Sequence, residues 1–152
     1  MIQARHQKTL ELDRVLAQLA ACASCEDSHA LALAVQPETS YSKAVQLLSF
    51  TASAYTLSVR YGYPNLIRMT NCSGALRRAA LGSSLTLREL LDISAVLRNQ
   101  RTLRQWREQS KAEPCALDEL FECLYRNKEI EDRLNSAILS EEELDDKASP
   151  AL

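Results

Sequence analysis

A chain of 152 residues with 46% apolar and 25% charged side chains is long enough for one compact domain, and its 3 glycines and 4 prolines are too few for a turn-rich all-β fold. The net charge of −2 does not by itself indicate a nucleic-acid binder, which is usually strongly basic. The sequence contains no run of about 18 apolar residues, so no membrane span is predicted. The odd count of five cysteines fits a reducing compartment, and a cytoplasmic location is therefore expected.

Helical periodicity dominates the N-terminal third of the chain. Apolar residues at three- and four-residue steps predict a first helix over residues 9–23. A second helix is predicted between a cap at Ser24 and a stop at Pro37. Three of its residues are expected to face inward: Ala30, Leu31 and Ala34.

The third predicted helix carries the longest apolar stripe. It begins after Ser40 and is stopped by Gly62 and Pro64. Its stripe has the alternating four- and three-residue spacing of a coiled coil, at Tyr41, Val45, Leu48, Ala52, Tyr55 and Val59. We call these six residues the seam and expect it to pack within the core of the chain. The alternative is that the seam faces a partner helix, which would make the chain a stand-alone protein–protein interaction module.

The middle of the chain is predicted to hold a loop and two helices. Residues 63–70 show no period and are interpreted as a loop. A short helix is expected between Asn71 and Gly82. Thr86 and Glu89 form a capping-box pattern, and the helix that they begin is expected to reach Gln109.

The C-terminal part is predicted to hold two shorter amphipathic helices after Pro114, over residues 117–124 and 130–138. Two interpretations of the next residues stay open. Ser140 and Glu143 fit a second capping box, and residues 138–146 fit a short β-hairpin with Leu144 on its return strand. Residues 149–150, Ser-Pro, are typical of a helix start, so a truncation is expected there. The predicted fold class is an all-α bundle of about six to seven helices, in a single helical domain over residues 1–152, with this hairpin as an option.

Three residues offer the pattern nearest to a metal site. Cys22 and Cys25 have zinc-ligand spacing and are followed by His29, but no second pair at matching spacing is present. The more ordinary interpretation is that Cys22 lines the first helix and Cys25 starts the second. No metal is therefore expected, and a redox pair is disfavoured because no βαβ pattern surrounds the two cysteines.

No catalytic or cofactor-binding residues are predicted. The two histidines do not neighbour a recognisable nucleophile motif, and three scattered glycines cannot form a phosphate-binding loop. The acidic residues 141–146 lack the spacing of a calcium loop and are interpreted as a solvated turn. The chain is therefore not expected to be an enzyme by itself.

A row of arginines is the remaining candidate for function. Four of them are spaced by three on one predicted helix: Arg98, Arg101, Arg104 and Arg107. This spacing drifts by about 60° at each step, so they spiral around half of the helix instead of forming a phosphate-tracking stripe. Trp106 lies among them and could stack on a base. A solvated helix face with Trp106 packed on a neighbour is favoured over a nucleic-acid contact.

Two stretches carry a family resemblance. Residues 8–16, K-T-L-E-L-D-R-V-L, and residues 75–93, A-L-R-R-A-A-L-G-S-S-L-T-L-R-E-L-L-D-I, resemble bacterial MutS-type proteins of the second, recombination-suppressing branch. Residues 148–152, A-S-P-A-L, are similar to the start of that family's long lever helix. The chain departs from the family in residues 63–70, which lack its paired glycines. The Phe-x-Glu wedge of mismatch readers is also absent.

The resemblance implies an indirect role for this chain. It would be the N-terminal part of the helical core, or lever, domain and would pass nucleotide state from an ATPase domain to clamp arms. By this resemblance, the complete protein would be an ATP- and Mg-dependent homodimeric clamp that acts on branched DNA or on stalled ribosomes. Their ATPase, clamp and Smr nuclease domains would be supplied by the rest of the polypeptide, beyond residue 152.

Overall fold

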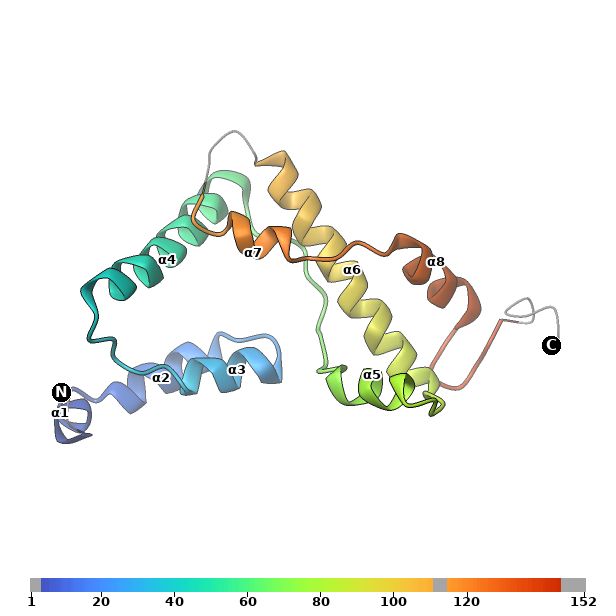
Figure 1. Ribbon diagram of the computed structural model, residues 1–152, viewed down its shortest axis with the longest axis horizontal. Coiled ribbons are helices and arrows are strands. Elements are labelled where there is room, and N and C mark those ends of the chain that lie inside the picture. The colour runs from blue at the N-terminus through green and yellow to red at the C-terminus, as the bar shows by residue number, and fades with distance from the viewer. Residues whose placement is uncertain (1–3, 111–114, 146–152) are drawn as a thin grey trace. The chain divides into compact units, whose positions relative to one another are not determined.

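The computed structural model describes residues 4–110 and 115–145, and these residues form helices without a β-sheet (Figure 1). The predicted all-α class is confirmed. Eight helices lie in these ranges, one more than the upper expectation: α1 (Ala4–Thr9), α2 (Leu12–Ala21), α3 (Glu26–Leu33), α4 (Tyr41–Tyr61), α5 (Ser73–Ala80), α6 (Leu87–Gln109), α7 (Asp118–Glu122) and α8 (Lys128–Ala137). No helix among them is long and apolar enough to cross a membrane.

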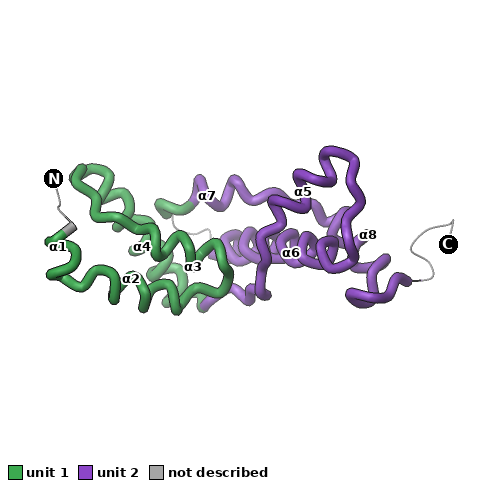
Figure 2. Tube along the Cα trace, turned by 90° about the horizontal axis from the view of Figure 1, so that it is seen from below, with its two compact units in different colours: residues 1–62, 114–117 green, residues 63–113, 118–152 purple. Residues whose placement is uncertain are grey.

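The chain divides into two compact units (Figure 2). Unit 1 comprises residues 1–62 and 114–117 and contains α1 to α4. Unit 2 comprises residues 63–113 and 118–152 and contains α5 to α8. That residues 1–152 act as one domain stays a prediction.

Unit 1 begins with two helices where one was predicted. Glu11 adopts a left-handed conformation with φ of 51°, which ends the helical path of α1 and lets α2 begin at Leu12. Residues other than glycine adopt this backbone conformation at a cost of about 1 kcal/mol. The Glu11 carboxylate accepts a 3.0 Å hydrogen bond from Arg14, one turn into α2. The predicted single helix over residues 9–23 was therefore wrong at its start.

Helices α2 and α3 pack against each other within unit 1. Leu16 and Ala20 of α2 are buried. Helix α3 buries none of its residues, and Leu31 is largely exposed. The predicted inward positions of Ala30, Leu31 and Ala34 were wrong, because an eight-residue helix with one neighbouring helix has too little cover to enclose them.

Unit 2 is organised around α6, which packs on α8 and more lightly on α7. The capping box at its start is confirmed. The backbone N–H of Glu89 donates to Thr86 Oγ1 over 3.3 Å, and the backbone N–H of Thr86 donates to Glu89 Oε2 over 3.0 Å. Helix α8 begins similarly, because Asn127 Oδ1 accepts a 3.1 Å bond from the Ile130 backbone N–H.

The end of the described chain turns back on itself. Ile138 and Leu144 form an antiparallel bridge, and the Asp145 backbone N–H donates to the Ala137 carbonyl over 2.9 Å. Of the two open interpretations, the hairpin is the nearer: the chain turns back as far as Asp145, but the bridge is isolated, and no strand and no helix follow Ser140 in the described residues. Asp146 and the predicted helix start at residues 149–150 lie outside the described residues.

Candidate interaction surfaces and the arginine network

A two-point ion pair joins α6 to α8 in unit 2. Arg101 donates from Nε to Glu131 Oε2 and from Nη2 to Glu131 Oε1, each over 2.8 Å. The Glu131 side chain is only 4% exposed, so its charge is removed from water and matched by a two-point ion pair. These hydrogen bonds hold the pKa of Glu131 below its usual value, although burial of the carboxyl acts in the opposite direction.

Two further arginines fasten α6 to the segment around α7. Arg104 Nη1 donates to the Leu124 carbonyl over 2.7 Å. Arg107 is buried; its Nε donates to Asp118 Oδ1 over 2.7 Å, and its Nη1 donates to the Ser110 carbonyl over 2.7 Å. These guanidinium groups therefore donate hydrogen bonds to backbone carbonyls and to a carboxylate within unit 2.

Neutral side chains complete the network. Asn99 is fully buried and pairs with the backbone of Ile67 twice: its Oδ1 accepts from the Ile67 N–H over 3.0 Å, and its Nδ2 donates to the Ile67 carbonyl over 2.7 Å. Ser94 Oγ donates to Asn135 Oδ1 of α8 over 2.7 Å. Neither Ser94 nor Asn99 was predicted from the sequence. The only available indication was a pair of small polar residues within an otherwise apolar face of the helix.

Three of the four arginines in the row are thus bonded within unit 2. Arg98 is exposed, whereas Arg101, Arg104 and Arg107 bond to groups of unit 2. The expected solvated face was therefore wrong for those three. The expected packing of Trp106 is confirmed: its ring lies 6.2 Å from that of Phe121, tilted by 50°. A nucleic-acid contact by this row stays a prediction.

The two cysteines of the candidate metal site each bond to a near neighbour in the chain. Cys22 Sγ donates to the Gln18 carbonyl over 3.4 Å, and Cys25 Sγ lies 3.0 Å from Ser28 Oγ. Bonding to Ser28 lowers the pKa of the Cys25 thiol. Neither these two residues with His29 nor other described residues form a group of three that could hold a metal ion. That the chain binds no metal stays a prediction.

The seam of α4 lies in water. Its large members are exposed, with Tyr41 at 85% and Tyr55 at 71%, and Ala52 is exposed as well. The expectation that the seam packs within the core of the chain is contradicted. The opposite side of the helix is the covered one: Leu57 is 4% exposed and Phe50 is half-buried. On that side Ser53 Oγ accepts a 3.2 Å bond from the backbone N–H of Ala116.

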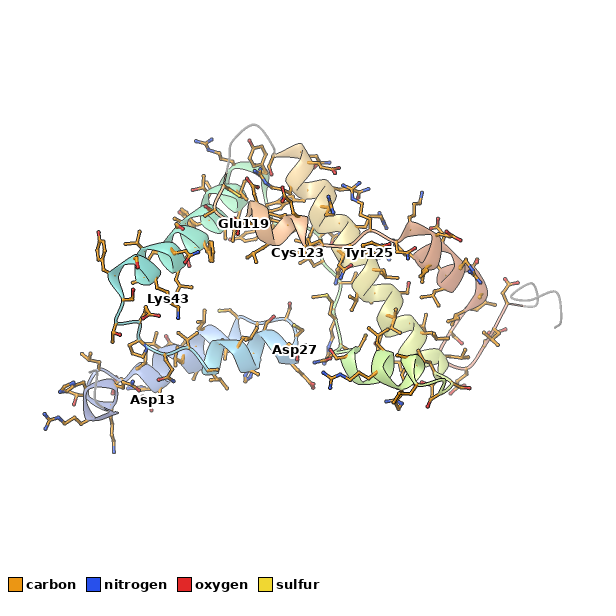
Figure 3. All side chains as sticks on the ribbon, viewed as in Figure 1. Asp13, Asp27, Lys43, Glu119, Cys123 and Tyr125 are labelled. Atoms are coloured by element: carbon orange, nitrogen blue, oxygen red, sulfur yellow. The ribbon has the colours of Figure 1, made fainter. Side chains whose placement is uncertain are left out.

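Unit 1 also contains an open cavity of about 400 Å³ beside α2. Its lining combines apolar side chains with a few polar ones, and Asp13 among them projects from α2 (Figure 3). The lining residues are Gln7, Lys8, Leu12, Asp13, Leu16, Leu33 and Gln36. Lys8 and Asp13 are the ionisable residues of this lining.

Comparison with known proteins gives a consistent group of relatives. The chain is 34% identical over 147 residues to the Endonuclease MutS2 of Ruminiclostridium cellulolyticum, a match that covers 95% of this chain and 19% of that protein. It is 32% identical over 148 residues to the protein of that name from Acetivibrio thermocellus, with the same coverage. For Clostridioides difficile the identity is 31% over 119 residues, or 76% of this chain and 15% of the relative. No family model matches. The chain therefore spans about a fifth of the length of the curated relatives it matches.

Proposed function

The chain is homologous along 95% of its length to a segment of proteins of the MutS2 branch, and on that basis we propose that it serves as part of their helical core. In this role it performs no chemistry. It passes the nucleotide state of an ATPase domain to clamp arms as a movement of stiff helices.

The observation that carries this proposal is the fastening of α6. A helix of 23 residues is about 35 Å long. Side-chain hydrogen bonds from Asn99, Arg101 and Arg107 tie it to residues 63–72, to α8 and to α7. A long helix held at several points along its length moves as one body, which is what a lever requires.

The chemistry and the targets of the whole protein belong to the same proposal. ATP and Mg²⁺ would bind elsewhere in the polypeptide, and any nuclease activity would also reside there. The complete protein would act as a homodimer on branched DNA or on a stalled ribosome, as the family resemblance implies. This chain contributes no cofactor ligand to that assembly.

A chimera tests the coupling role. This chain replaces the matching segment of the Ruminiclostridium cellulolyticum relative, and ATP turnover and ATP-dependent change in affinity for branched DNA are measured. In the chimera, Arg101→Met should leave ATP turnover within about twofold and reduce the coupling between nucleotide and DNA by about tenfold. Arg88→Met is the control, because Arg88 pairs with Glu141 at the surface. Equal coupling in the two variants would sink the proposal.

One observation favours a second candidate function. The exposed seam of α4 suits a stand-alone helical module that binds a partner helix. In that case the chain would act without an ATPase, and the chimera would show no dependence of coupling on Arg101.

A further inference from the structure

Helix α4 has apolar side chains on two opposite faces. Phe50 and Leu57 lie on the covered face. The seam lies about half a turn away from them and is exposed. A helix that is apolar on opposite faces is suited to an interior position, with neighbours on both sides. Within the described residues, α4 has cover on only one of those sides.

The chemistry of the seam specifies what would cover it. The only charged residues of α4 are Lys43, in its first turn (Figure 3), and Arg60, in its last, and neither belongs to the seam. The positions that flank the seam hold small or hydroxyl-bearing residues: Ser42, Ala44, Ser49, Thr51, Thr56 and Ser58. Charged residues at such positions usually select a charged partner. Their absence here selects an uncharged apolar helix, and the small side chains allow its backbone to approach closely.

The exposed area is large enough for a stable contact. The five large side chains of the seam together expose on the order of 700 Å², given the size of aromatic and branched side chains. A standard interface needs about 800 Å² from each partner. One helix laid along α4 would therefore bury an area close to that of a specific interface.

We propose that the seam of α4 is the docking site of an uncharged apolar helix from the part of a MutS2-type polypeptide that this chain does not contain. This inference rests on the proposed function for the origin of that helix. The chain spans 19% of the length of its relatives, so about four fifths of such a polypeptide is available to supply it. The covered face of α4 then holds the chain's own residues, and the seam holds the incoming helix.

Hydroxyl-radical oxidation of tyrosines, followed by mass spectrometry, tests the docking directly. The chain contains matched controls: Tyr41 and Tyr63 are 85% and 86% exposed, and Tyr55 and Tyr125 are 71% and 69% exposed. Tyr125 follows α7 in unit 2 and is not part of α4 (Figure 3). In the 152-residue chain all four should be oxidised readily. In the chimera, oxidation of Tyr41 and Tyr55 should slow by at least about fivefold, because a packed side chain touches several others and loses its water.

A variant separates docking from a general change in the chimera. Tyr55→Asp should restore the oxidation of Tyr41 in the chimera, whereas Tyr125→Asp should not. Unprotected Tyr41 and Tyr55 in the chimera, or equal protection of Tyr63 and Tyr125, would overturn the proposal. Protection in the 152-residue chain that increases at about a hundredfold higher concentration would show a second copy on the seam instead.

Protection in the 152-residue chain at every concentration would place the cover within these residues and would equally overturn the proposal. The outcomes for docking and for coupling are independent. A chimera with protected Tyr41 and Tyr55 but no change of coupling in Arg101→Met would refute the lever function and leave the docking site intact. The reverse pattern would refute the docking site alone.

Discussion

Glu131 and Arg107 are charged side chains with little access to water, and each is matched by an opposite charge. Replacing such pairs by apolar groups is often harmless to stability, whereas removing one partner leaves a buried charge without compensation. The pairs therefore contribute chiefly to where α6 lies relative to α7 and α8. Their value to the molecule is positional, and their loss should be costly.

Arg101→Met tests this at the residue scale. The substitution keeps most of the side-chain volume but removes both hydrogen bonds to Glu131, whose carboxylate stays buried. We expect the free energy of unfolding to fall by about 3 kcal/mol, as for other broken buried pairs. Urea denaturation followed by circular dichroism measures it.

The matched control is Arg88→Met. Arg88 pairs with Glu141, and both side chains are more than half exposed. Because surface ion pairs contribute about 0–1 kcal/mol, this variant should differ little from the unsubstituted chain. Similar losses in the two variants would mean that burial does not distinguish these pairs.

The lowered pKa of Glu131 also predicts a dependence on pH. A carboxyl whose pKa is lower in the folded chain than in the unfolded chain stabilises the fold above the unfolded value, about 4.3 for glutamate, and loses this contribution as the pH falls through the folded value. The glutamine side chain in the Glu131→Gln variant cannot titrate. The difference in unfolding free energy between the unsubstituted chain and Glu131→Gln should therefore be largest near neutral pH and shrink below about pH 4.3. A difference that stays constant from pH 7 into the acid range would contradict this assignment.

At the scale of elements, the capping box of α6 fixes where the longest helix begins. Thr86→Ala removes the acceptor of the Glu89 backbone N–H. It should lower the free energy of unfolding by about 1 kcal/mol, the usual cost of losing such a cap. Thr56→Ala, at an exposed position inside α4, is the control and should be neutral or slightly stabilising, because alanine favours helices. Thermal unfolding of the two variants measures both changes in stability, and equal changes would contradict the role of the cap.

The same elements show what could be predicted from sequence. The start of α6 and the end of α4 were predictable because a capping box and Gly62, with φ of 73°, act locally. The break before α2 was not, because Glu11 is not a residue type that marks a left-handed turn. Periodicity identified the seam of α4 as an apolar stripe but did not point to the face that holds Phe50 and Leu57. It could not tell which face is covered, since that depends on segments far along the chain.

The arginine row shows the same limit for the candidate site. A spacing of three gave the direction of each side chain around α6 but not its partner. Arg101 meets Glu131 thirty residues later in the chain, and Arg104 meets the Leu124 carbonyl. Such pairings follow from how α7 and α8 return to α6, which no local pattern encodes.

At the scale of the whole molecule, few apolar side chains are enclosed. The buried apolar residues of the described chain are Leu16, Ala20, Leu57, Cys72, Ala75 and Ile138, and many more large apolar residues are exposed. A self-sufficient domain of this length buries about 70% of its unfolded surface. The exposed apolar side chains are most concentrated along α4, which agrees with a chain that completes its packing against other segments.

The charge of the whole chain predicts its affinity for DNA. The net charge is −2, and Arg101, Arg104 and Arg107 bond to groups of unit 2, which leaves Arg98 as the exposed member of the row. If all four contacted phosphates, the logarithm of the affinity would fall with that of the salt concentration with a slope of about −3.6 on duplex DNA; with Arg98 alone the slope is about −0.9. We expect the shallow slope, and a Kd for branched DNA weaker than about 1 µM at 0.15 M salt. Fluorescence anisotropy across a salt series measures both. Sub-micromolar binding with the steep slope would mean that Arg101, Arg104 and Arg107 leave their partners in unit 2 to reach the phosphates.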